Sequence, residues 1–262
     1  MNRKVLAVII AVGIILGGVI IFNLVKGCGP GSPSGVMNTS ASGLLNQAKV
    51  LLAKGDLLGA RNIYLKLIND FTNSSEVMNW QKKAEELNIK LLFSPIITPK
   101  SLLYEIKPGD TLTKISHQFK TTPELIKKSN NLGGALIPGR KIKVWNAPFN
   151  ILVDKSHNTL TLKSEEEVLK TYVVATGKDN CTPVGNFRIT NKLVNPTWFK
   201  KGDNVIAPAD PKNALGTRWL GIDMAGYGIH GTIEPQNLGK QVTEGCVRMV
   251  NADVEEIGRA HV

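Results

Sequence analysis

The chain has 262 residues, of which 42% are hydrophobic, enough for one or two globular units with their own cores. Lys and Arg outnumber Asp and Glu by 32 to 21, and the net charge of +11 favours an anionic partner such as a membrane or wall surface. The basic residues are spread out, without arginine-rich or aromatic runs, which argues against nucleic acid, and three cysteines (Cys28, Cys181, Cys246) are too few for a disulfide framework.

The N-terminus carries a long apolar run directly after the basic start "MNRK". Val5–Val25 holds no charged residue, and its length is about the 20 residues that a helix needs to cross a bilayer. A cleaved signal peptide has a shorter apolar run. Positive charge before the span places the N-terminus in the cytoplasm. Residues 1–26 are therefore predicted to be a cytoplasmic start and a single-pass transmembrane anchor, with the rest in the periplasm or cell-wall space.

Residues 27–43 are rich in Gly, Ser and Pro and are predicted to be a flexible tether. The tether contains Cys28 at the end of "VKGC", which loosely resembles a lipoprotein signal. Lys26 stands where such a signal has a small residue. Two readings of Cys28 stay open, a lipidated residue and a plain linker thiol.

Residues 44–93 are predicted to be helical, because apolar residues recur at spacings of three and four. Gly55-Asp56 separates the first helix from the second. The stretch "AKVLLAKGDLLGARNIYLKLINDF" resembles a tetratricopeptide-type hairpin. A solenoid of such repeats needs about three copies, and the region has room for fewer. Both a three-helix spacer and a partner-docking site remain open.

Residues 102–146 are predicted to form a short strand, a turn, two short helices and a second strand. Thr111 and Thr122 stand at helix N-caps, and Pro123 occupies a first helical position. With "YEIKPGDTL", "NNL" and "PGRKIKV", the segment is similar to LysM domains. The resemblance implies a βααβ unit that binds glycans containing N-acetylglucosamine. His117 is interpreted as a surface or groove residue.

From residue 149 onward, short alternating segments between turns predict a mainly-β domain, with a closed or sandwiched sheet and short helical insertions. This region contains "YGIHG" at His230 and "TEGCVRM" at Cys246. The pair can be a catalytic dyad, part of a metal site or two buried residues. A zinc site needs three or four ligands, and the sequence near the pair supplies no others. His157 and His261 lie far from the pair in sequence, and Cys181 is interpreted as incidental.

The His–Cys pair suits acyl transfer. A thiol is mostly protonated at neutral pH, and an imidazole can take its proton and return it to a leaving amine. Gly245 lets the backbone around Cys246 present N–H groups to an oxyanion. A backbone carbonyl, with Gly231 near in sequence, would serve to orient the imidazole of His230.

These motifs, with "TPVGNFRITNKLVNPTWF" upstream, are similar to the signature of the L,D-transpeptidase catalytic (YkuD) family. The resemblance implies that Cys246 is the nucleophile, that His230 is its general base and acid, and that the Gly231 carbonyl orients the imidazole. Thr243 and Arg248 are predicted to contact substrate, although Arg248 equally suits a structural ion pair. Glu244 departs from the family, many members of which have His there. No metal or organic cofactor is expected.

The family resemblance predicts a peptidoglycan L,D-transpeptidase in which Cys246 attacks the bond between residues three and four of a tetrapeptide stem. D-Ala leaves, and an amine from another stem or from a wall protein resolves the thioester. The LysM-like segment is expected to hold the enzyme on the glycan. Two rivals remain, an L,D-carboxypeptidase that uses water as acceptor and a non-catalytic wall-binding protein.

The chain closes with "NADVEEIGRAHV". Asn251 is predicted to cap a last helix. Residues 257–262, "IGRAHV", are also the translation of a sequencing-adapter string. We therefore expect this tail to be artefactual and the catalytic domain, residues 149–256, to be truncated at its C-terminus.

Overall fold

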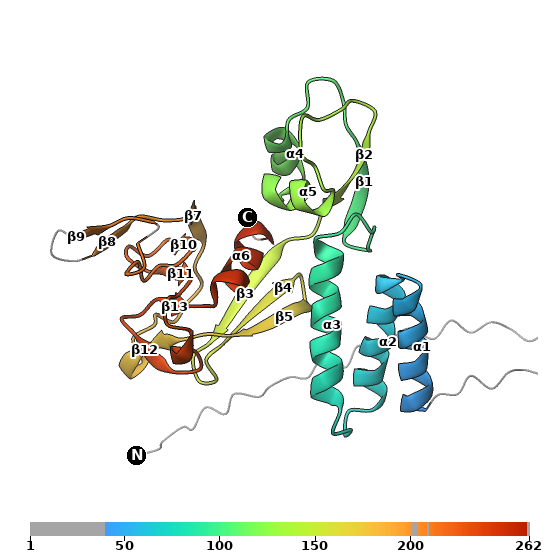
Figure 1. Cartoon of the computed structure of the whole chain (residues 1–262), viewed down its shortest axis with the longest axis horizontal. Coiled ribbons are helices and arrows are strands. Elements are labelled where there is room, and N and C mark those ends of the chain that lie inside the picture. The colour runs from blue at the N-terminus through green and yellow to red at the C-terminus, as the bar shows by residue number, and fades with distance from the viewer. Residues whose placement is uncertain (1–39, 201–203, 209, 261–262) are drawn as a thin grey trace, which may run out of the picture. The chain divides into compact units, whose positions relative to one another are not determined.

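The computed structural model describes residues 40–200, 204–208 and 210–260 (Figure 1). The predicted transmembrane anchor, Cys28 and His261 lie outside the described residues. Among the helices that are described, none has both the length and the apolar character that a bilayer crossing requires.

The first region is a set of three helices that begins earlier than predicted. Ser40 accepts the Gly43 N–H at 3.2 Å, so residues assigned to the tether form the first helical turn. Asp56 caps the second helix in the same way, accepting the Gly59 N–H at 2.8 Å. Small and aromatic side chains, including the buried Trp80, fill the core between the helices. The helices are α1 (Ala41–Ala53), α2 (Leu57–Asp70) and α3 (Val77–Leu92).

The second region is a βααβ unit, as the sequence predicts. Thr111 and Thr122 cap its helices by accepting the N–H groups of Lys114 and Leu125, and Pro123 opens the second helix. Its two strands pair antiparallel around a core of Ile and Val side chains. The elements are β1 (Ser101–Glu105), α4 (Leu112–Phe119), α5 (Pro123–Ser129) and β2 (Lys141–Trp145).

The third region is mainly β, and its strands are short. Instead of one closed sheet, the described residues form an antiparallel sheet β3-β4-β5, a mixed sheet in the order β13-β11-β10-β7, a parallel pair β6–β12 and a hairpin β8–β9. The strands are β3 (Phe149–Asp154), β4 (Thr159–Ser164), β5 (Glu167–Val173), β6 (Thr176–Gly177), β7 (Ile189–Val194), β8 (Trp198–Lys200), β9 (Asn204–Ile206), β10 (Arg218–Ile222), β11 (Gly228–His230), β12 (Gln241–Thr243) and β13 (Val247–Arg248). Two short 3-10 turns, at Lys178–Asn180 and Pro235–Asn237, interrupt the connections.

One helix, α6 (Asn251–Ala260), joins the two larger sheets. Its Val254 and Ile257 are fully buried in the core that also holds Leu160 of β4 and Leu220 of β10. Lys170 of β5 forms ion pairs with two carboxylates of α6, at 2.8 and 3.3 Å. These apolar contacts and ion pairs hold α6 between the antiparallel sheet and the mixed sheet. The assignment of residues 257–262 to an artefactual tail stays a prediction.

Helix α3 is tied to β5 by polar contacts. The Asn88 amide donates to the carbonyl oxygens of Val168 and Leu169, at 3.2 and 3.1 Å. Arg61 of α2 forms an ion pair with Glu167 at the start of the same strand. Because these groups are partly or fully buried, the contacts contribute more than exposed pairs would.

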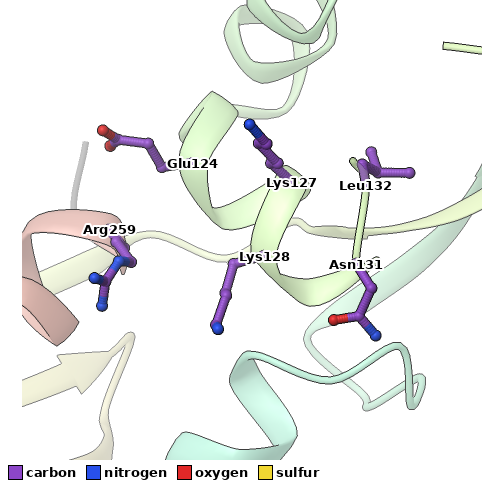
Figure 2. A pocket seen from close by; sticks show the side chains of 6 residues that line it. All are labelled: Glu124, Lys127, Lys128, Asn131, Leu132 and Arg259. Carbon is purple, nitrogen blue, oxygen red and sulfur yellow. The ribbon is translucent and has the colours of Figure 1, made fainter. Parts of the chain in front are cut away.

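The βααβ unit contacts both of the other regions. The ammonium group of Lys143 donates to the Leu91 and Ser94 carbonyls at the end of α3, at 2.6 and 3.0 Å, and burial lowers its pKa to about 8. The Thr122 hydroxyl donates to the Arg259 carbonyl of α6 at 2.5 Å. Beside this contact lies an open cavity of about 290 Å³ (Figure 2). It is lined by Glu124, Lys127, Lys128, Asn131, Leu132 and Arg259, and by none of the predicted site residues.

Candidate active site

Two neighbouring strands bring the predicted His and Cys to the same part of the mixed sheet. β11 and β13 pair in parallel, with His230 opposite Arg248. Cys246 lies directly before β13, and its thiol reaches the Gly226 carbonyl just ahead of β11. The intervening chain passes through a 3-10 turn and β12 before it returns to form β13. The fold thus closes the sequence gap between the two residues.

His230 is 4% exposed, and its Nδ1 lies 2.7 Å from the Gly231 carbonyl oxygen. A carbonyl only accepts hydrogen bonds, so Nδ1 carries the proton and Nε2 is the basic nitrogen. Trp219, opposite His230 in β10, stacks on the imidazole with ring centroids 5.6 Å apart. Burial lowers the pKa of His230 to about 4, against the opposing effect of the Gly231 carbonyl. The imidazole is therefore neutral at pH 7.

The thiol of Cys246 is half-buried and donates to the Gly226 carbonyl at 3.5 Å. Burial raises the pKa of this thiol, while the Gly228 backbone and Arg248 act in the opposite direction. Glu244, which departs from the family pattern, raises it further. The raised pKa of the thiol and the lowered pKa of the imidazole both favour a neutral pair at pH 7.

A tight turn presents Cys246. The Thr243 hydroxyl donates to the Cys246 carbonyl at 2.6 Å and accepts the Gly245 N–H at 3.1 Å. Gly245 has φ +122°, and a Cβ there would lie 2.5 Å from the Tyr227 ring, so glycine is required. Thr243 is 2% exposed. This geometry favours a structural role for Thr243 over the predicted substrate contact. The Gly245 N–H, predicted to face an oxyanion, is occupied by the Thr243 hydroxyl. The next backbone donor along the turn is the Cys246 N–H.

Arg248 lies beside the dyad with its guanidinium partly engaged. Its Nη1 is 3.2 Å from a Glu234 carboxylate oxygen. Its Nε is buried and has no hydrogen-bond partner among the residues that the structure describes. The structural ion pair is therefore present, whereas the buried Nε does not face solvent; the substrate contact of Arg248 stays a prediction.

Trp219 was missed by the sequence analysis. Added Cβ atoms at Gly221 and Gly228 would lie 2.8 Å from its indole nitrogen and 2.9 Å from its ring carbons, respectively. The glycines of "WLGIDMAGYGIHG" thus make room for the indole that covers His230. A Trp followed by glycines before a candidate catalytic His is the signal that could have identified it.

The other His and Cys residues lie apart from the dyad or serve other contacts. His157 is exposed and pairs with Asp154 at 2.7 Å, and His117 is exposed on α4. Cys181, interpreted as incidental, is exposed with its sulfur 3.8 Å from the Thr243 carbonyl, beside the turn. Within the described part of the chain, no three His, Cys, Asp or Glu side chains are grouped to hold a metal ion.

Comparison with known proteins gives two family matches. Residues 148–259 match the L,D-transpeptidase catalytic domain (YkuD), and residues 104–145 match the LysM domain. A putative L,D-transpeptidase YkuD of Bacillus subtilis (strain 168) is 35% identical over 164 residues, covering 60% of this chain and 91% of that protein. The putative L,D-transpeptidase YqjB of the same organism is 43% identical over 110 residues, covering 40% of this chain and 61% of that protein. The solved catalytic domain of an E. faecium L,D-transpeptidase is 21% identical, with a TM-score of 0.35 over 44% of this chain and 94% of that one.

Proposed function

Because the chain belongs to the L,D-transpeptidase catalytic-domain family and also carries a LysM domain, we propose that it is a peptidoglycan L,D-transpeptidase acting through a cysteine thioester. The observation that carries this proposal is the neutral His230, held by the Gly231 carbonyl in β11, with Cys246 directly before the paired strand β13. That arrangement supplies a nucleophile, a base with a defined tautomer and a protected setting for acyl transfer.

In the first half-reaction, Cys246 Sγ attacks the carbonyl carbon of the third residue in a tetrapeptide stem. The thiol turns away from the Gly226 carbonyl, and its proton passes to His230 Nε2 as the S–C bond forms. The Cys246 N–H stabilises the oxyanion. The bond to D-Ala then breaks, and His230 returns the proton to the departing amine. The products are a thioester and free D-Ala.

In the second half-reaction, the amine of another stem or of a wall protein attacks the thioester carbonyl. His230 Nε2 takes a proton from that amine, the C–S bond breaks, and the sulfur leaves as a thiol after reprotonation. We expect the guanidinium of Arg248, which pairs with Glu234 beside His230, to orient a substrate carboxylate. The chemistry needs no metal or organic cofactor.

The LysM domain supports a location at the wall. A glycan-binding module raises the local concentration of stem peptides around the catalytic domain. The apolar run Val5–Val25 supports a single-pass anchor with the catalytic domain outside the cytoplasm. Flotation of membranes from cells that produce the full chain tests the anchor; recovery only in the soluble fraction contradicts it.

The decisive test incubates the full chain with tetrapeptide muropeptides and follows products by mass spectrometry. We expect dimers, free D-Ala and an acyl-enzyme adduct, all abolished by Cys246→Ala because the nucleophile is gone. Cys181→Ser is the matched control and should retain activity. Product formation by the Cys246→Ala variant contradicts the proposed mechanism. Tripeptides without dimers identify an L,D-carboxypeptidase, and no product from the unaltered chain identifies a non-catalytic wall-binding protein.

A further inference from the structure

The peptide unit that holds the catalytic imidazole has a second partner. The Gly231 carbonyl accepts from His230 Nδ1 at 2.7 Å, and the N–H of the same peptide unit, that of Thr232, donates to Asn251 Oδ1 at 3.1 Å. In a trans peptide these two groups point in opposite directions across one rigid plane. An acceptor that fixes the N–H therefore also fixes the direction of the carbonyl.

Asn251 is the first residue of α6, and its side chain bonds to backbone groups outside that helix. The sequence analysis predicts that Asn251 caps this helix, but its side-chain oxygen instead accepts the N–H groups of Thr217 and Thr232, at 3.2 and 3.1 Å. Val250 accepts the first helical N–H groups through its carbonyl. Asn251 thus joins the end of the loop before β10 to the segment after β11.

The glycines around Asn251 are fitted to its side chain. A Cβ at Gly231 would lie 2.0 Å from Asn251 Oδ1, and one at Gly216 would lie 2.1 Å from it. Gly216 also has φ +63°, a conformation that glycine adopts at low cost. No side chain fits between Asn251 and the Gly231–Thr232 peptide, so the contact is direct.

We propose that Asn251 is a positioning residue, which sets the tautomer and direction of His230 through the Gly231–Thr232 peptide. Asn251 corresponds to the third residue of a catalytic triad, which orients the imidazole, except that one peptide unit lies between the Asn251 and His230 side chains. Hydrogen bonds in such a chain polarise one another, so Asn251 also strengthens the acceptor that holds Nδ1–H. The inference rests on the proposed role of His230 as the general base.

The test compares the full-length chain with Asn251→Ala, Asn251→Asp and Asn251→Ser. The first removes the acceptor, the second keeps it, and the third retains a polar side chain too short to reach the Thr232 N–H. We expect Asn251→Ala and Asn251→Ser to lower kcat on tetrapeptide by roughly 10- to 100-fold with KM within about twofold, since a misdirected base slows chemistry more than binding. Asn251→Asp should restore most of kcat.

A direct readout is the ¹⁵N NMR spectrum of the His230 ring, which distinguishes the two neutral tautomers. The unaltered chain should carry the proton on Nδ1, and Asn251→Ala and Asn251→Ser should populate the Nε2–H form. Asn130→Ala is the matched control, because Asn130 is a buried Asn that ties α5 to β2. It should lower the melting temperature and leave the His230 spectrum and kcat unchanged.

Each outcome bears on one claim. An Nε2–H tautomer in the unaltered chain overturns the inference whether or not any variant folds. A folded Asn251→Ala or Asn251→Ser with the original spectrum and kcat overturns it as well. A tautomer change in a chain that makes no product supports the inference and contradicts the proposed function instead.

Discussion

At the scale of single residues, the site pairs a neutral thiol with a neutral imidazole. Burial raises the pKa of Cys246 and lowers that of His230 to about 4, so the two shifts both oppose a preformed thiolate–imidazolium pair. Arg248 lowers both pKa values, which favours a thiolate but disfavours an imidazolium. In the proposed reaction, His230 must therefore take the thiol proton from a neutral pair, so we expect the rate to depend on how accurately His230 is positioned.

The pH profile of acylation tests this charge state. His230 is expected to act as a base only when neutral, and its pKa is about 4, so D-Ala release in the first turnover should stay level from pH 7 to about 5 and fall by half near pH 4. Initial rates across this range measure it. In Trp219→Leu, which exposes the ring, the midpoint should move up toward about 6.5, the value of an unperturbed histidine. An acid midpoint near 6.5 in the unaltered chain contradicts the assignment.

At the scale of secondary-structure elements, α3 and α6 position the sheets that carry the site. α6 supplies Asn251 at one end and buried apolar residues along its length. α3 supplies Asn88, whose side-chain amide donates to two backbone carbonyls of β5. Each helix thus joins parts of the chain that are far apart in sequence.

Replacing Asn88 by Ala should lower the free energy of unfolding by about 1–3 kcal/mol, because two carbonyls of β5 and the Arg61 guanidinium lose a buried partner. Urea denaturation measures the change. Asn79→Ala on the same helix is the control: Asn79 is exposed and its side chain bonds to Glu76, so its loss should cost under about 0.5 kcal/mol. Equal losses in the two variants would argue against a role for Asn88 in joining α3 to β5.

The sequence predicts local features of these elements and misses long-range ones. Thr111, Thr122 and Pro123 mark helix starts because capping depends on neighbouring residues alone. Asn88 contacts a strand 80 residues away, and no local pattern encodes that distance. At the site, the motif predicts His230 and Cys246 as the pair, whereas the engaged Thr243 hydroxyl depends on a turn geometry that composition does not reveal.

At the scale of the molecule, the described chain consists of three regions joined by buried polar contacts. Lys143 joins the LysM domain to α3, Thr122 joins it to α6, and Asn88 joins α3 to β5. Each contact is a hydrogen bond from a side chain to a backbone carbonyl of another region, in a buried or partly buried setting. The three regions should therefore depend on one another for stability.

Scanning calorimetry of the full chain should show one main unfolding transition for the three regions, because separate unfolding would break these contacts. Thr122→Val and Thr111→Val form a matched pair. Both remove a helix cap, but only Thr122 also donates to the Arg259 carbonyl. Thr122→Val should lower the transition temperature more. Three resolved peaks, or equal shifts in the two variants, would mean that the regions unfold independently.

The contrast between the two described thiols has a consequence for chemical labelling. Cys181 is exposed beside the turn, whereas Cys246 is half-buried with a raised pKa. General alkylating reagents react with thiolates, so they will modify Cys181 in preference and report little about occupancy of the active site. Under the proposed mechanism, a selective probe of Cys246 carries an acylating group that uses His230 as the base. Screens for such probes are best run in a Cys181→Ser background.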